Sequence, residues 1–91
     1  MEYYFLYNKS YEREFMKNIF LDMGFNEEIR KIMGTDVFRY FRGDIFVNLT
    51  SQKEGRIQIQ TPFNKPRDEI IELKDKLKPD RIVDMNLEDI I

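Results

Sequence analysis

Apolar residues follow two different periods along this chain, and the change of period predicts where its helices and strands lie. Residues 3–7 form a short aromatic-rich run closed by polar turn residues, which favours a buried strand. Between residues 11 and 23 apolar side chains recur at every fourth position, as they do along one face of a helix. From residue 36 to residue 63 apolar and polar residues alternate, which is typical of strands with one buried face.

The first helix is expected to begin after Ser10, whose hydroxyl could cap the free backbone N–H groups of the first turn. Glu12 and Glu14 would then lie in that turn, where the helix dipole favours acids. The stripe expected to face the core comprises Tyr11, Phe15, Ile19 and Met23, with Phe20 beside it. Gly24 predicts the end of this helix.

A second, shorter helix is expected directly afterwards. Asn26 is a suitable cap residue, and Glu27 and Glu28 follow it in the first turn. Its apolar side would comprise Ile29, Ile32 and Met33. Gly34 predicts its end.

The alternating segment is expected to form a three-stranded antiparallel meander. Gly43-Asp44 predicts a two-residue hairpin turn, because glycine readily adopts the positive φ that such turns need. This turn sets Tyr40 opposite Val47, and a second loop near residues 52–55 sets Val47 opposite Ile59. The two registers agree on which residues share a face. The inner face, expected to line the core, comprises Phe38, Tyr40, Ile45, Val47, Leu49, Ile57 and Ile59; the outer face comprises Val37, Arg39, Phe41, Phe46, Asn48, Thr50, Arg56, Gln58 and Gln60.

A further helix is expected from Pro66, with an apolar stripe of Ile70, Leu73 and Leu77, until Pro79 prevents its continuation. Residues 81–85 suit a short last strand, and residues 86–91 a frayed final turn. Each main helix has one apolar stripe and the meander has one apolar face. The predicted fold class is therefore α+β: one domain over residues 1–91, a two-layer sandwich in which an antiparallel β-meander and an N-terminal strand have two main helices packed on one face.

Composition narrows the chemistry. The chain has 91 residues, 42% of them hydrophobic, and a net charge of −2, which suits a single small globular domain. It contains no histidine and no cysteine, so it lacks the usual zinc ligands, a thiol nucleophile and the histidine base of most hydrolases. We expect no enzyme activity, no catalytic residue, no metal site and no cofactor. The C-terminal acids Asp80, Asp84, Glu88 and Asp89 are interpreted as a solvated acidic surface.

The N-terminal segment has an acid at position 2 and an apolar run too short for a signal peptide or a membrane span. A cytoplasmic protein without a membrane partner is expected. The chain contains no alanine and is rich in Phe, Tyr, Met, Ile, Asn and Lys, a bias typical of A/T-rich genes such as those of low-GC bacteria, their phages and some archaeal viruses. A phage or viral origin would place the protein in the host cytoplasm.

The outer face combines aromatic rings, arginines and amides. The candidate binding residues are Arg39, Phe41, Phe46, Asn48, Arg56, Gln58 and Gln60. Aromatic and arginine residues are enriched at the centres of protein interfaces, so either a protein partner or a second copy of the chain, in a homodimer, is expected to cover this face. The same residue types also stack on and hydrogen-bond to unpaired nucleic-acid bases.

The leading functional prediction is a small, non-catalytic regulatory or inhibitory protein that binds a protein partner. A phage or mobile element would encode it, and its target would be host nucleic-acid-handling machinery. The acids Glu12, Glu14, Asp22, Glu27 and Glu28, expected on helices, could imitate phosphates towards such a target. The alternative is a single-stranded nucleic-acid-binding module that uses the outer face, although an acidic chain with few arginines there limits phosphate-driven affinity. The sequence leaves open the identity of the partner, and whether the acids or the outer face contact it.

Overall fold

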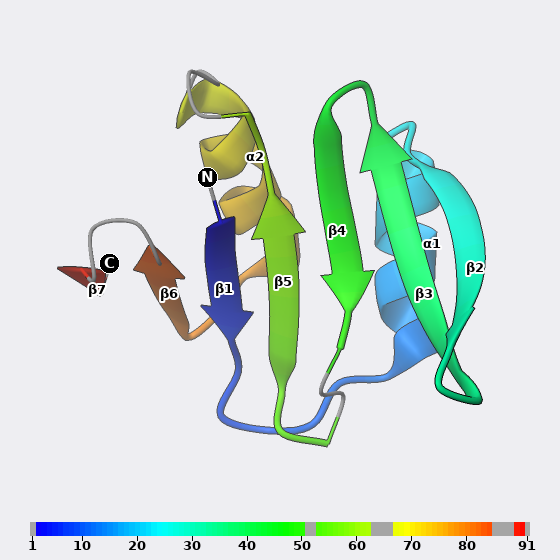
Figure 1. The fold of residues 1–91 in the computed structure, drawn as a ribbon. Coiled ribbons are helices and arrows are strands. Elements are labelled where there is room, and N and C mark those ends of the chain that lie inside the picture. Colours follow the sequence, from blue (N-terminus) through cyan, green and yellow to red (C-terminus); the bar gives the residue numbers. More distant parts are fainter. Residues whose placement is uncertain (1, 51–52, 63–66, 85–88, 91) are drawn as a thin grey trace.

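The computed structural model describes residues 2–50, 53–62, 67–84 and 89–90. Within them, two helices lie on the same side of one antiparallel sheet (Figure 1). The elements are, in chain order, β1 (Glu2–Leu6), α1 (Arg13–Asp22), β2 (Asn26–Ile32), β3 (Thr35–Arg42), β4 (Ile45–Leu49), β5 (Arg56–Gln60), α2 (Arg67–Leu77), β6 (Arg81–Asp84) and β7 (Asp89–Ile90). The strand order is β2-β3-β4-β5-β1-β6-β7. The predicted α+β two-layer sandwich, with two helices on one face of the sheet, is confirmed.

The meander of β3, β4 and β5 has the register that its alternating pattern predicts. Tyr40 lies opposite Val47 across the Gly43-Asp44 turn, and Val47 lies opposite Ile59 in the next pair. The inner-face residues are buried, except that Phe38 is half-buried against the cluster. The N-terminal strand β1 pairs with β5 on one side and β6 on the other. It therefore lies inside the sheet, not at its edge.

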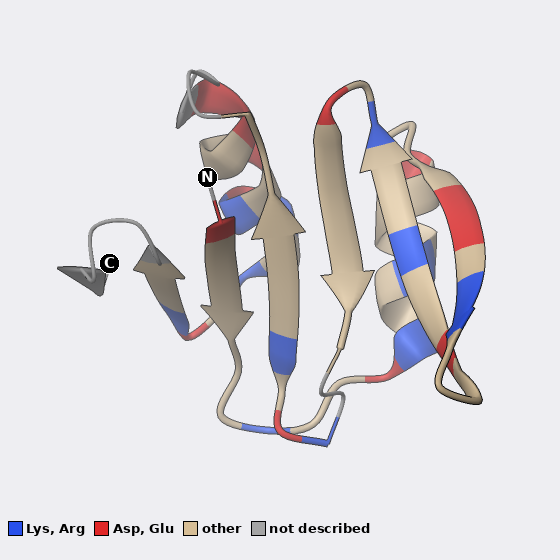
Figure 2. Cartoon of the chain, viewed as in Figure 1, with Lys and Arg blue, Asp and Glu red and all other residues tan. Residues whose placement is uncertain are grey.

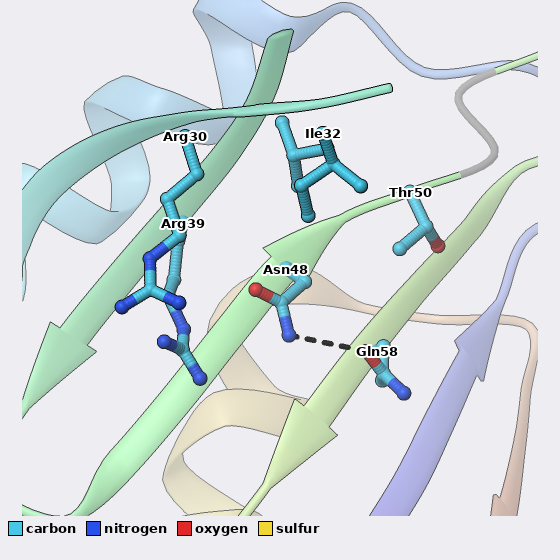
Figure 3. A pocket seen from close by; sticks show the side chains of 7 residues that line it. Arg30, Ile32, Arg39, Asn48, Thr50 and Gln58 are labelled. Carbon is cyan, nitrogen blue, oxygen red and sulfur yellow. Dashed lines mark hydrogen bonds between the residues drawn. The ribbon is translucent and has the colours of Figure 1, made fainter. Parts of the chain in front are cut away.

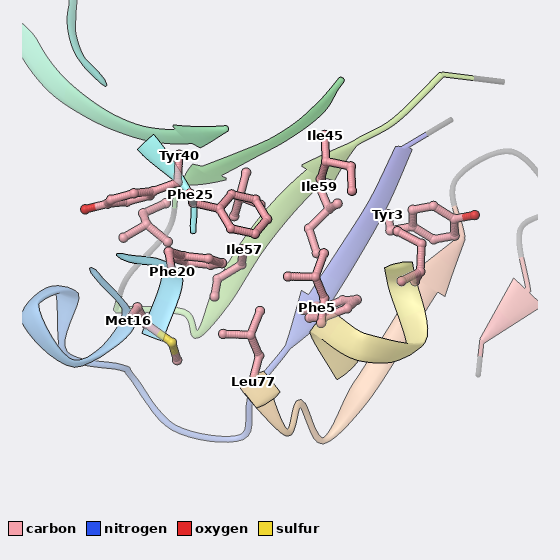
Figure 4. Packing of buried hydrophobic residues seen from close by; sticks show 14 of the residues in the cluster. Tyr3, Phe5, Met16, Phe20, Phe25, Tyr40, Ile45, Ile57, Ile59 and Leu77 are labelled. Atoms are coloured by element: carbon pink, nitrogen blue, oxygen red, sulfur yellow. The ribbon is translucent and has the colours of Figure 1, made fainter. Parts of the chain in front are cut away.

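The core fills the space between the inner face and the two helices (Figure 4). Phe20 of α1 stacks on Tyr40 of β3, with ring centroids 5.1 Å apart, and Phe25 packs against Phe20 at 5.5 Å. The second helix contributes its predicted stripe of Ile70, Leu73 and Leu77, all of which are buried. Pro66, the predicted start of α2, lies outside the described residues. Because both layers bury apolar side chains in one shared cluster, this packing stabilises the sandwich.

Arg42 lies on the inner side of β3, in phase with Tyr40, and closes one end of the core. Its guanidinium donates a 2.8 Å hydrogen bond to the carbonyl of Met23, which follows α1. It also lies 3.7 Å from a carboxylate oxygen of Glu69 and 3.3 Å from one of Glu72, both on α2. One cation therefore bridges the sheet and both helices.

The first helix is rotated relative to its predicted stripe. It begins at Arg13, so Glu12 and not Ser10 holds the N-cap position, and no side chain caps it. Met16 and Phe20 are buried, whereas Phe15 is 63% exposed, so the predicted stripe is wrong at Phe15. The reason is that a spacing of four drifts by about 40° per step around a helix of 3.6 residues per turn. Tyr11, which set the phase of that stripe, precedes the helix and is buried independently of it.

Residues 26–32 form a strand, so the predicted second helix is wrong. Gly24 ends α1 with φ +86°, and the N–H of Phe25 donates to the carbonyl of Phe20, as in a Schellman motif. The chain then leaves extended, and β2 pairs with β3 along its whole length, from Asn26 opposite Phe41 to Ile32 opposite Thr35. The strand forms because β3 lies beside it. The predicted cap at Asn26 and the stop at Gly34 do not determine the structure of this segment.

Of the two predictions for the C-terminal segment, one is confirmed and one is wrong where the structure describes it. The predicted last strand is confirmed over Arg81–Asp84, which pairs with β1. The predicted frayed turn is wrong at Asp89–Ile90, which form β7 beside β6. The other residues of that predicted turn, together with position 85, lie outside the described part of the chain.

Candidate binding surface on the open face of the sheet

The face of the sheet opposite the helices is the candidate site. No described helix or strand lies over it (Figure 1). The structure brings all seven predicted binding residues together on this face, where each is half-buried: Arg39, Phe41, Phe46, Asn48, Arg56, Gln58 and Gln60. Because β1 lies beside β5, Tyr4 joins them opposite Gln58. We call these eight residues the outer patch.

Arginine side chains lie over the aromatic rings of the outer patch. The guanidinium carbon of Arg39 is 4.3 Å from the centroid of the Phe46 ring, and Phe41 packs at 6.2 Å from Phe46. Arg56 lies over the Tyr4 ring at 5.4 Å. Such cation–π contacts hold each arginine close to the sheet and partly shield the ring below it from water.

Amide side chains form a hydrogen-bonded row across the middle of the outer patch. The Nδ2 of Asn48 donates to Oε1 of Gln58 at 3.1 Å, and Nε2 of Gln58 donates to Oε1 of Glu2 at 2.6 Å. Separately from this row, Nη2 of Arg39 donates a long 3.4 Å bond to Oε1 of Gln60. The Nε of Arg39 is buried without a hydrogen-bond partner in the described chain. The hydrogen-bonding groups of Arg39 are thus less completely paired than those of Asn48 and Gln58.

A shallow hollow of about 300 Å³ adjoins the outer patch where β2 and β3 curl away from β4 (Figure 3). Its lining comprises Arg30, Ile32, Val37, Arg39, Asn48, Thr50 and Gln58. The Nε of Arg30 donates a 2.7 Å hydrogen bond to Oε1 of Glu28, and this bond lowers the pKa of Glu28 below its ordinary value. Glu28 therefore stays ionised and offsets part of the positive charge at the hollow.

Charge on the open face is sparse and separated (Figure 2). Most of β3, β4 and β5 is uncharged there, with arginines at positions 39 and 56. The outer positions of these three strands include no acid. The surface is therefore weakly basic and largely apolar or amide in character.

The acids predicted to imitate phosphates do not share a helical surface, which corrects that expectation. Glu27 and Glu28 belong to β2, where successive side chains point to opposite faces of the sheet. Glu27 accepts a 2.7 Å hydrogen bond from the hydroxyl of Tyr40 and lies 3.8 Å from Nζ of Lys17. Glu28 is held by Arg30 on the other face. The acids left on or beside α1 are Glu12, Glu14 and Asp22.

Other candidate chemistries have no built site in the described residues. Among these residues, no group of three or more Asp, Glu, His or Cys side chains is placed to hold a metal ion. Asp80 accepts a 2.7 Å hydrogen bond from the backbone N–H of Asn8, which ties together the loops that follow β1 and α2. The side chains of Asp84, Glu88 and Asp89 lie outside the described part. Neither described helix is long and apolar enough to cross a bilayer.

Comparison of the chain with models of known families, with curated proteins and with solved structures gives no significant match.

The sequence does not predict that Tyr4, or Glu28, Arg30 and Ile32 of β2, belong to the open face. Tyr4 belongs to the face because β1 pairs with β5, a strand more than fifty residues away along the chain. Arg30 reaches it because β2 is a strand and pairs with β3. Residues 3–7 are a continuous aromatic and apolar run, so their pattern does not say which face of the strand Tyr4 is on or which strand is the neighbour.

Proposed function

We propose that this chain is a non-catalytic regulatory or inhibitory protein that binds a protein partner through the outer patch. The observation that carries the proposal is the layer of Arg39 over Phe46, beside Phe41, on a sheet face that no described element covers. Aromatic and arginine side chains of this kind form the energetic centres of protein interfaces. A partner that covers them would gain apolar burial and would strengthen the cation–π contact by removing water.

The charge of the outer patch defines the chemistry of that partner. Arg39 has a long hydrogen bond to Gln60, no acid stands on the outer positions of β3, β4 or β5, and Glu28, opposite Arg39 on β2, forms its ion pair with Arg30. A carboxylate of the partner could therefore pair with the Arg39 guanidinium, with apolar side chains packed on Phe41 and Phe46. We infer a partner surface that combines acids with apolar residues. The compositional bias supports a phage or mobile-element origin, with the host cytoplasm as the location and a host nucleic-acid-handling protein as the target.

The experiment is an affinity capture from the source cell, with quantitative mass spectrometry of wild type and of matched variants. Arg39→Ala and Phe46→Ala are expected to lose the same protein that wild type captures. Phe15→Ala is the control, because Phe15 is an exposed aromatic residue on the opposite layer. A protein kept by the control and lost by both outer-patch variants supports the proposal. A captured protein that all variants retain contradicts it.

Single-stranded nucleic acid is the second candidate ligand of the same face. The observation that favours it is the hollow where Arg30 and Arg39 lie together beside the amides of Asn48 and Gln58. Two features count against it: Glu28 neutralises Arg30, and the guanidinium of Arg39 covers the ring face on which a base would stack.

This alternative has its own test. It predicts binding of a single-stranded oligonucleotide, measured by fluorescence anisotropy, with an affinity that falls steeply as salt increases. Phe41→Ala should weaken that binding by about 1–3 kcal/mol if a base stacks there. An absence of binding at low salt removes this alternative and leaves the protein-partner proposal in place.

A further inference from the structure

The strand β2 forms one edge of the sheet and carries an unusual order of charges. It has seven residues, Asn26–Ile32, none of them proline, and six of the seven are exposed. Along it come two acids, then Ile29, then two bases, visible as a red block and a blue block in Figure 2. Charged residues usually protect an edge strand from other strands. Here the order is such that, if a second β2 strand lay antiparallel to the first, the acids of each strand could lie opposite the bases of the other.

The backbone of β2 also has hydrogen-bonding groups in the right places that pair with no other described strand. The turn at Met33-Gly34 is a two-residue hairpin, so the pair that flanks it, Ile32 and Thr35, is a hydrogen-bonded pair. Hydrogen-bonded and non-hydrogen-bonded pairs alternate along an antiparallel ladder. The N–H and C=O groups of the alternate residues Glu27, Ile29 and Lys31 therefore point away from β3, towards the open edge.

We propose that two copies of the chain form a symmetric dimer by antiparallel pairing of their β2 strands, with the two-fold axis at Ile29. In this register Ile29 faces Ile29 of the second copy, Glu28 faces its Arg30, and Glu27 faces its Lys31. The outward-pointing groups of Glu27, Ile29 and Lys31 then bond to each other across the axis. Ile29, which is 56% exposed in one copy, is buried against its equivalent.

Only this register satisfies both the backbone and the charges. Because residues with outward-pointing groups must face one another, the two-fold axis must pass through a residue of β2 and not between two residues. An axis at Glu27, Glu28, Arg30 or Lys31 would place that residue against its own equivalent, and like charges directly opposite each other are destabilising. An axis at either end of β2 would leave most of its charges without an opposite charge across the interface. Parallel pairing in register would set every charge against an identical one. The Ile29 axis alone gives opposite charges at each charged pair, so the edge selects a second copy in one arrangement.

The dimer is independent of the outer patch. Because paired residues in a sheet point to the same face, the open faces of both copies would continue into one surface on the same side. Both α1 helices would lie on the other side. The pairing therefore leaves the outer patch of each copy free for its partner, so failure of the dimer would not bear on the proposed function.

The test is a charge swap at the outer-face pair, followed by sedimentation velocity across a concentration series. Glu28→Lys and Arg30→Glu each place like charges opposite each other twice in the dimer, once on each side of the axis. Each single variant is expected to weaken dimerisation by about tenfold or more relative to wild type. Asp75→Lys, an exposed charge change on α2, is the control and should dimerise like wild type.

An equimolar mixture of the two single variants is the decisive sample. Glu28 and Arg30 are also paired within one chain, so either variant alone also loses that internal contact. In the mixture the internal pair stays broken, whereas both pairs between chains regain opposite charges. We expect the mixture to form a heterodimer with nearly wild-type affinity. A wild-type protein that stays monomeric at all concentrations, variants that dimerise like wild type, or a mixture that stays monomeric would each overturn the proposal.

Discussion

Replacement of Gly55 by alanine is expected to destabilise this protein far more than its place in a surface turn suggests. Gly55 is buried just before β5, and its φ is +68°, in the left-handed region. A Cβ at this position would meet the backbone carbonyl oxygens of Lys9 and of Tyr7, the latter at 2.6 Å. The backbone N–H of Tyr7 also donates a 2.7 Å hydrogen bond to the carbonyl of Gly55. The two segments are thus held too close for a side chain.

Three terms contribute to the loss of stability. A residue with a Cβ in the left-handed region costs about 1–2 kcal/mol. The contact with two backbone oxygens forces the segments apart, which costs roughly 1–3 kcal/mol as for other overpacked sites, and about 1 kcal/mol more for the lost Tyr7–Gly55 hydrogen bond. The sum of roughly 3–6 kcal/mol is a large part of a total stability on the order of 5–15 kcal/mol. For a chain of this size it corresponds to a decrease in Tm of roughly 15–35 °C.

The assay is thermal unfolding followed by circular dichroism, with Gly24→Ala as the matched control. Gly24 has a similar φ of +86°, and nothing lies within 4 Å of the Cβ that alanine would add. That variant should show the backbone cost alone, a decrease in Tm of roughly 5–15 °C. If Gly55→Ala and Gly24→Ala melt within a few degrees of each other, residues 7–9 do not pack against Gly55, and the reasoning fails.

Three further predictions concern the core and its titration. Val47→Asp should abolish cooperative unfolding, since an unpaired buried carboxylate costs several kcal/mol, and a variant that melts like wild type would contradict the β4 register. Met16→Ala should lower the free energy of unfolding by about 2–4 kcal/mol and Phe15→Ala by less than about 1 kcal/mol, measured by urea titration; the reverse order would contradict the phase of α1. Burial raises the pKa of Tyr11 from 10.0 to about 12, so its contribution to stability is complete below pH 10 and is lost as the pH rises towards 12. Tyr11→Phe should therefore reduce the loss of stability over that interval, and an unchanged pH profile would refute this assignment.

The parts of the fold that sequence predicts well are those in which the deciding contacts are close along the chain. The Gly43-Asp44 turn connects adjacent strands, and a two-residue turn fixes the register in which those two strands pair. A slip of one residue would turn Val47 and Ile59 outward, which the burial of apolar surface forbids. Seven candidate residues therefore share one face, as predicted, even though their function stays a prediction.

The parts that fail are those in which local signals are ambiguous and a distant element decides. Residues 26–34 have a cap residue, acids in the right place and a terminal glycine, all of which fit a short helix. They also fit an exposed strand between two turns, and a helix of so few residues is marginal by itself. Pairing with β3, together with the Tyr40 to Glu27 hydrogen bond, favours the strand. None of these contacts is visible in the segment's own pattern.

The alternation of β3 predicts which face Arg42 lies on, but it does not predict which groups Arg42 contacts. Its parity with Tyr40 places it on the inner face, beside apolar residues, where a cation needs acceptors. The sequence offers acids on the final helix, but which of them approach depends on how α2 crosses the sheet. In the structure Glu69, Glu72 and the Met23 carbonyl supply them. Both helices are thereby tied to the inner face at one end, and neither is left to cover Phe41 and Phe46. The open face is therefore a consequence of where the helices find their partners, and it is the face that the proposed protein partner would cover.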